Sequence, residues 1–132
     1  QVGRPIEVYE KPANLFVASF LGTANILEGV LQDQKFLLGD VAIPVPAHAH
    51  VTAQSKLVFR PQHVRIHSGD DTGLPAQVQQ LEFLGSTIRY ELKLGSAHVI
   101  AEVPFTSAKD LRHVGDMVHI HMDAEHLMWL SE

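Results

Sequence analysis

The amino-acid sequence predicts an all-β protein that closes into a small barrel. From Thr87 to Leu94, apolar and polar residues alternate without a break, as on an antiparallel strand with one buried face. The same period continues through residues 98–103 after a two-residue Gly95-Ser96 connection, which suits a tight hairpin. The preceding strand changes phase near Gln79-Gln80, where one inserted residue is typical of a β-bulge. A long bent strand followed by a hairpin is how small barrels close.

The apolar positions of the alternating strand define the predicted core face. They are Ile88, Tyr90, Leu92 and Leu94. Because successive side chains on a strand point to opposite faces, we expect all four to be buried and the residues between them to face outward.

The first 24 residues differ from the rest and predict a helical connector ahead of a β-domain at residues 25–132. Pro5 and Pro12 each stand where a helical turn begins. The run from Asn14 to Leu21 is strongly apolar and ends at Gly22, a natural helix stop. Phe16 and Phe20 fall on one side of such a helix, and its next side is also apolar. A helix of this kind must pack against something.

The remaining elements are short strands separated by turn signals. Residues 39–40 form the turn of one predicted hairpin, Pro61 interrupts the ladder between two strands, and residues 68–73 form the clearest loop. Residues 107–111 are compatible with one helical turn. The predicted strands are residues 26–31, 35–38, 41–45, 56–59, 64–67, 117–122 and 127–130.

The two halves of the chain share an order of features. FLLGDVAIPVP at residues 36–46 is similar to LKLGSAHVIAEVP at residues 92–104, and QHVRI at 62–66 is similar to EHLMW at 125–129. Each half runs through a strand, a glycine turn, a strand, a proline and a closing histidine followed by apolar residues. Two intertwined half-barrels related by duplication would produce this pattern, and so would chance similarity between short strands.

Composition bounds the class of protein. The chain has 132 residues, of which 45% are hydrophobic and 19% charged, as in an ordinary soluble globular domain. No run approaches the ~20 apolar residues that span a bilayer, and we expect no signal peptide before the fold. The absence of cysteine fits a reducing compartment. Because Gln1 is not a start residue, we expect the chain to be a piece of a longer protein.

Sequence motifs for catalysis are absent. The chain has no GxxxxGK[ST] phosphate loop, no GxSxG elbow and no HExxH pair. The adjacent carboxylates Asp70 and Asp71 lie in the predicted loop and are interpreted as a solvated turn. We therefore predict no chemistry, no cofactor and no metal in this part of the protein.

Histidine is the compositional oddity, with nine in the chain. Two i, i+2 pairs, His48/His50 and His119/His121, would each share one strand face. A metal site needs further ligands, which His126 or Asp123 could supply to the second pair. We interpret the pairs as exposed polar positions; a pH-sensing role is the alternative.

A basic segment surrounds Pro61. Its residues are Lys56, Arg60, His63, Arg65 and His67, with Phe59 as the one aromatic side chain. Such a patch could bind single-stranded nucleic acid through phosphate contacts and stacking. The net charge of −5 disfavours that function, so we interpret the segment as a solvated face and expect no nucleic-acid partner.

Two stretches resemble the ATPase subunits of bacterial ABC importers. QVGRPIEVYEKPANLFVASFLGTANIL at residues 1–27 resembles the G-x-P-x-E-[IV]-Y-x-x-P-x-x-x-F-V-A-x-F-[IL]-G-x-x-N run that ends their ATPase domain. LVFRPQHVRI at 57–66 and VQQLEFLGSTIRYELKLG at 78–95 resemble the RPE-x-[VI]-x-[IL] and V-x-x-x-E-[FY]-L-G motifs of the transport-associated OB (TOBE) domain that follows. Gln62 stands where the family more often has an acid. The positions that match the first run are Gly3, Pro5, Glu7, Val8, Tyr9, Pro12, Phe16, Val17, Ala18, Phe20, Leu21, Gly22 and Asn25.

This resemblance implies an OB-like (MOP-like) barrel at residues 25–132, with residues 1–24 as the tail of an ATPase domain. It implies a regulatory and dimerisation domain that forms a homodimer, contacts its own ATPase domain and acts indirectly on the membrane permease. ATP and Mg would belong to the missing ATPase domain and none to this fragment. The protein would be cytoplasmic and peripheral to the inner face of the membrane.

The resemblance also suggests a subfamily and a joint. The motifs are nearer those of ferric-iron and spermidine/putrescine importers than of the maltose type. Phe16, Phe20, Gly22 and Asn25 would form the hinge or the ATPase-docking connector, with a plain linker as the alternative. A function of another class also remains open, a free-standing OB-type module that binds a small oxyanion or an oligonucleotide.

Overall fold

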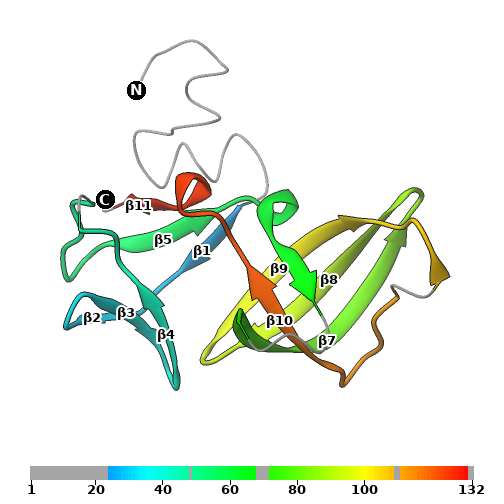
Figure 1. Cartoon of the computed structure of the whole chain (residues 1–132), viewed down its shortest axis with the longest axis horizontal. Helices are drawn as coiled ribbons and strands as arrows, with labels where there is room; N and C mark the ends of the chain where they lie inside the picture. The colour runs from blue at the N-terminus through cyan, green and yellow to red at the C-terminus, as the bar shows by residue number, and fades with distance from the viewer. Residues whose placement is uncertain (1–23, 48, 68–71, 109–110, 131–132) are drawn as a thin grey trace, which may run out of the picture.

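The computed structural model describes residues 24–47, 49–67, 72–108 and 111–130 (Figure 1). Apart from short 3-10 turns, the regular elements of these residues are β-strands, which confirms the predicted all-β class. No helix among the described residues has the length and hydropathy needed to cross a membrane. The predicted connector helix and most of the loop at residues 68–73 lie outside the described residues.

The strands follow the predicted order. They are β1 (Asn25–Leu27), β2 (Val30–Gln32), β3 (Lys35–Leu38), β4 (Val41–Pro44), β5 (Lys56–Phe59), β6 (Arg65–His67), β7 (Leu74–Leu84), β8 (Thr87–Leu94), β9 (Ala97–Pro104), β10 (Met117–His121) and β11 (Met128–Leu130). Two 3-10 turns, η1 (Pro61–His63) and η3 (Ala124–His126), separate β5 from β6 and β10 from β11. The helical turn expected at residues 107–111 falls partly outside the described residues, although Leu111 N donates to Ala108 O at 3.3 Å.

One strand prediction is wrong. The segment 26–31 is two strands rather than one, because β1 pairs with β5 and β2 pairs with β3 in a different sheet. The break falls at Glu28-Gly29. A Cβ on Gly29 would lie 2.6 Å from Leu37 O and 2.8 Å from the ring of Phe36, so the chain turns where only glycine fits.

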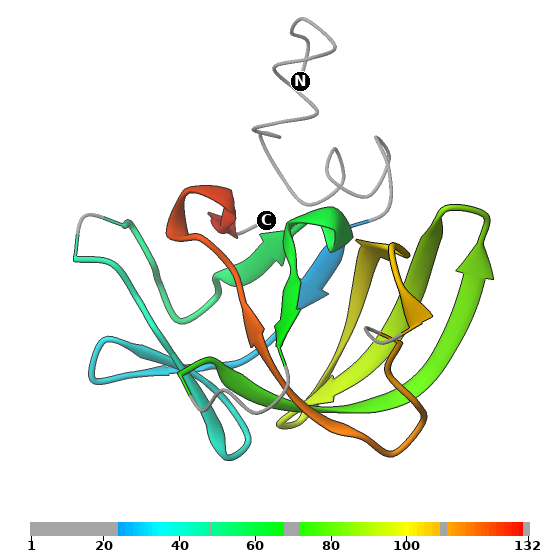
Figure 2. The same cartoon turned by 45° about the vertical axis from the view of Figure 1, so that its right-hand side comes forward.

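Three antiparallel sheets enclose one core (Figures 1 and 2). Their strand orders are β1-β5-β11, β6-β10-β7-β8-β9 and β2-β3-β4. A single hydrophobic cluster takes side chains from all three sheets, among them Leu57, Tyr90 and Phe36. The described residues therefore form one barrel-like body rather than two.

The central β7-β8-β9 unit has the predicted geometry. The β7–β8 register shifts between Val78 and Gln80, so the expected bulge lies at Gln79. Leu94 faces Ala97 across the two-residue Gly95-Ser96 connection, which confirms the hairpin. The four predicted core residues of β8 are at most 2% exposed, which confirms the facing.

Strand pairing confirms that two half-repeats are intertwined. The pairs β1–β5, β2–β3 and β3–β4 of the first half correspond to β7–β10, β7–β8 and β8–β9 of the second. Each half also gives its last strand to the other, because β11 pairs with β5 and β6 pairs with β10. Chance similarity of short strands would not reproduce this whole pattern of connections.

Equivalent points of the two halves touch each other at two places. The glycine turns meet where Ser96 N donates to Leu38 O at 3.2 Å. The 3-10 turns meet where the rings of His63 and His126 stack, with centroids 3.8 Å apart and planes 18° from parallel. These contacts lie where a local two-fold relation between the halves would place them.

Candidate functional site

The sequence predicts a joint to a preceding domain at Phe16, Phe20, Gly22 and Asn25. The first three lie outside the described residues, whereas Asn25 opens β1 and is only 5% exposed. Its Nδ2 donates to Ile100 O at 2.9 Å, and Ile100 N donates to its Oδ1 at 2.7 Å. The side-chain amide thus pairs with the edge of β9 as a neighbouring strand would. Asn25 anchors the start of the described chain to a second sheet.

Replacing Asn25 with alanine is expected to destabilise the domain by about 1–3 kcal/mol, because both polar groups of Ile100 lose their partner. Urea unfolding followed by circular dichroism should give a lower midpoint with an unchanged slope. Gln32→Ala, an exposed amide on the edge strand β2, is the control and should change the midpoint little. Equal effects of the two substitutions would contradict the anchoring role of Asn25.

Neither histidine of the second pair, His119/His121, belongs to a group of three possible metal ligands among the described residues. His48 lies outside the described residues, and His119 and His121 on β10, which lies between β6 and β7 in its sheet, are half-buried rather than exposed. The ring of His121 instead meets that of His67 edge-on, with centroids 4.7 Å apart. The interpretation of this second pair as exposed positions is therefore wrong.

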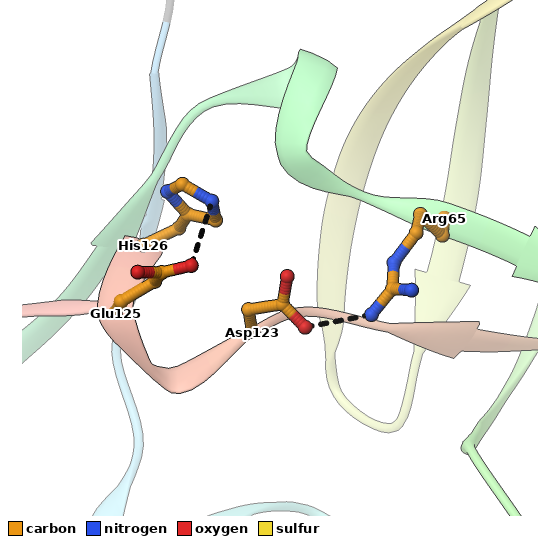
Figure 3. Close-up of polar contacts among 4 residues, drawn as sticks. All are labelled: Arg65, Asp123, Glu125 and His126. Atoms are coloured by element: carbon orange, nitrogen blue, oxygen red, sulfur yellow. Dashed lines mark hydrogen bonds and ion pairs between the residues drawn. The ribbon is translucent and has the colours of Figure 1, made fainter.

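A different cluster brings three possible metal ligands together near η3. Atoms of Asp123, Glu125 and His126 lie within 4.8 Å of one another (Figure 3). Arg65 Nη2 donates to Asp123 Oδ1 at 2.7 Å, and His126 Nε2 lies 3.8 Å from Glu125 Oε1. Arg65 already neutralises the carboxylate of Asp123. The cluster is therefore better explained as an ion pair that joins β6 to the start of η3 than as a cation site.

The basic segment around Pro61 does not form one surface. Phe59 is fully buried in the core and Arg60 is 4% exposed. Arg65 bonds to Asp123, and Lys56 Nζ lies 3.9 Å from Glu28 Oε1. The interpretation of the segment as a solvated face is wrong at Phe59 and Arg60, and the buried ring has no face on which a base could stack.

Two surface hollows lie on the described part of the chain, and the lining of the first is mainly apolar. One of about 360 Å³ lies between β4 and β10, where Pro44, Pro46 and Met122 form its wall. Another of about 320 Å³ lies beside β8, where Tyr90 OH accepts a 2.9 Å hydrogen bond from Arg112 N. The tyrosine hydroxyl is thus engaged with backbone, and the hollow between β4 and β10 suits contacts with apolar groups.

An exposed aromatic patch lies at the tip of the β7–β8 hairpin, at the opposite end of the domain from β2 (Figure 1). Phe83 is 55%, Leu84 44% and Phe105 39% exposed, and the two phenyl rings meet edge-on with centroids 5.9 Å apart. We name these three residues the tip patch. Exposed apolar side chains that cluster in this way are typical of contact surfaces.

Comparison with known proteins gives one family and a set of relatives. Residues 57–130 match the family described as "TOBE domain". The sn-glycerol-3-phosphate import ATP-binding protein of Salmonella choleraesuis is 43% identical over 93 residues, covering 65% of this chain and 26% of that protein. The sulfate/thiosulfate import ATP-binding protein of Bacillus cereus is 31% identical over 126 residues, covering 91% of this chain and 35% of that protein.

The chain therefore spans between about a quarter and a third of the length of these relatives. Their names cite glycerol 3-phosphate and sulfate rather than iron or polyamines, so the expected subfamily stays a prediction. The similarity to the Bacillus cereus protein covers more of the chain than residues 25–132 alone.

Proposed function

Because the chain belongs to the TOBE domain family, we propose that it is the C-terminal regulatory and dimerisation domain of the ATP-binding subunit of an ABC import system. The observation that carries the proposal is the 91% coverage of the chain by an import ATP-binding protein, which extends beyond the β-domain. In this proposal the fragment carries no chemistry, and ATP and Mg bind the ATPase domain that precedes it. The subunit would be cytoplasmic and held at the inner face of the membrane by the permease.

The proposed mechanism is tethering. Two ATPase domains must approach each other to close on ATP and must separate afterwards. A lasting contact between their regulatory domains would raise the effective concentration of one ATPase domain for the other. A partner that bound one arrangement of these domains better would shift the closing equilibrium.

We propose that Phe16, Phe20, Gly22 and Asn25 form the joint through which this coupling passes. The two hydrogen bonds between the Asn25 side chain and the Ile100 backbone support a fixed end at Asn25. Gly22 would then absorb the change in backbone angles, because glycine tolerates conformations closed to other residues. The two phenylalanines would contact the ATPase domain.

A domain exchange tests the proposed function. Residues 25–132 would replace the corresponding region of the sn-glycerol-3-phosphate import ATP-binding protein of Escherichia coli O157:H7, which is 39% identical over 93 residues. We expect the chimera to support more glycerol 3-phosphate uptake than a subunit from which the region is deleted. Uptake no higher than that of the deletion would contradict the proposal, provided immunoblotting detects equal amounts of both proteins.

The tip patch is proposed as the contact between two copies. We expect the isolated chain to self-associate in sedimentation equilibrium, and Phe83→Ser/Phe105→Ser to weaken this association because two apolar side chains are lost from the interface. Val30→Ser is the matched control, since Val30 is 62% exposed at the other end of the domain. A strict monomer at high concentration, or equal association of the double variant and the parent chain, would argue against this contact.

A further inference from the structure

The sheet formed by β1, β5 and β11 is apolar on both faces. Leu57 and Phe59 of β5 face the main core, so Val58 between them faces the opposite way. In the strand register, Ile26 lies beside Val58 on one side and Met128 lies beside it on the other. These three residues form an apolar row across the full width of the sheet on its outer face.

This outer row forms the centre of a second hydrophobic cluster. Val58 is 0% exposed, and Ala24, Ile26, Met128 and Leu130 pack around it partly buried. An antiparallel sheet with one face in water alternates apolar and polar residues along its strands, and β5 and β11 do not. The ion pair between Lys56 and Glu28 borders the cluster. The outer face of the β1-β5-β11 sheet is therefore apolar enough to pack against another element rather than to face water.

The apolar segment at residues 14–21 comes just before β1 in the sequence and could pack on this face. Ala24, a member of the cluster, is separated by two residues from the apolar run 14–21. As a helix, eight residues would be about 12 Å long. Three strands at ~4.8 Å spacing are about 10 Å across. The run therefore has the length to cross the row from Ile26 to Met128.

We propose that the segment Asn14–Leu21 packs on the outer face of the β1-β5-β11 sheet and closes a second core centred on Val58. A segment tethered by two residues has a far higher effective concentration at this face than a second copy of the chain has. The helix expected there is apolar on two adjacent sides, with Phe16 and Phe20 on one and Val17 and Leu21 on the next. The expected helix can therefore contact the sheet through one apolar side while its other apolar side contacts a preceding domain. The inference concerns this chain alone and stands whether or not the proposed transport function is correct.

Methionine oxidation tests whether the segment covers the sheet. Met128 lies in the cluster, whereas Met117 is 65% exposed on β10 and serves as an internal control. In Phe16→Ser/Val17→Ser/Phe20→Ser/Leu21→Ser, hydrogen peroxide should oxidise Met128 several-fold faster than in the parent chain, as measured by peptide mass spectrometry. The rate at Met117 should stay the same. Leu15→Ser, on the opposite side of the expected helix, should leave both rates unchanged. An unchanged Met128 rate in the fourfold variant would overturn the proposal.

A cysteine experiment keeps the proposal testable if the fourfold variant does not fold. The chain has no cysteine, so Met128→Cys combined with Val17→Cys or Leu21→Cys gives a single possible bridge within one chain. We expect a disulfide within the monomer on a non-reducing gel for at least one pair, and none for Met128→Cys with Leu15→Cys. Disulfides found only between two chains would overturn the proposal and identify the sheet face as a contact between copies.

Discussion

Replacing Leu92 with aspartate is expected to unfold the whole domain. Leu92 lies in the middle of β8, and its cross-strand neighbours are Val78 on β7 and Val99 on β9. All three are 0% exposed, so a carboxylate at this position would have neither water nor a described polar partner. An unpaired charge in such a place costs several kcal/mol, comparable with a total stability of about 5–15 kcal/mol. The measurement is a thermal melt followed by circular dichroism.

Lys93→Asp is the matched control for this substitution. Lys93 is the next residue of β8 and is exposed on the opposite face, so the same carboxylate there stays in water. We expect that variant to melt close to the parent chain. A soluble Leu92→Asp variant with a cooperative melt would show that the assigned core face of β8 is wrong.

The second largest effect is expected at the turn between β8 and β9. Gly95 has a φ of 60°, and a Cβ there would overlap the carbonyl oxygen of Leu38. We expect Gly95→Ala to lose about 1–3 kcal/mol from the backbone conformation alone. A further loss comes from the forced separation of the two turns, because Leu38 O also accepts the hydrogen bond from Ser96 N. Denaturant unfolding measures the sum of both losses.

Gly85→Ala separates the two contributions. Gly85 also has a positive φ, 77°, but a Cβ there would meet no atom within 4 Å. This control carries the conformational strain without the overlap. If both variants lost the same free energy of unfolding, the contact between the turns would contribute nothing to stability.

Local patterns in the sequence predicted most of the fold. The alternation at residues 87–94, the phase change at Gln79 and the Gly95-Ser96 turn each depend on neighbours within a few residues, and each is confirmed. The order of the two half-repeats was also visible in the sequence. Whether the two halves share one intertwined strand arrangement was open until the strand pairing was known, because β5–β11 and β6–β10 join residues far apart in the chain.

The candidate site depended on tertiary contacts that no local pattern encodes. Asn25 was expected at the joint, but its pairing with Ile100 spans 75 residues. The sequence suggested that Phe59 and Arg60 belong to a basic surface. In the structure both are buried, with Phe59 in the main hydrophobic core. His63 and His126 could have been paired in advance from their equivalent positions in the two repeats. Their ring stacking still required the two 3-10 turns to meet.

The sequence by itself determined the all-β class, the face of β8 that is buried and the family motifs, because periodicity and motifs are properties of neighbouring residues. Only the tertiary structure decided which strands pair across the halves, where Asn25 is anchored and that the β1-β5-β11 sheet has a second apolar face. The physical reason is that an alternating strand specifies which side chains share a face but not which element will cover that face.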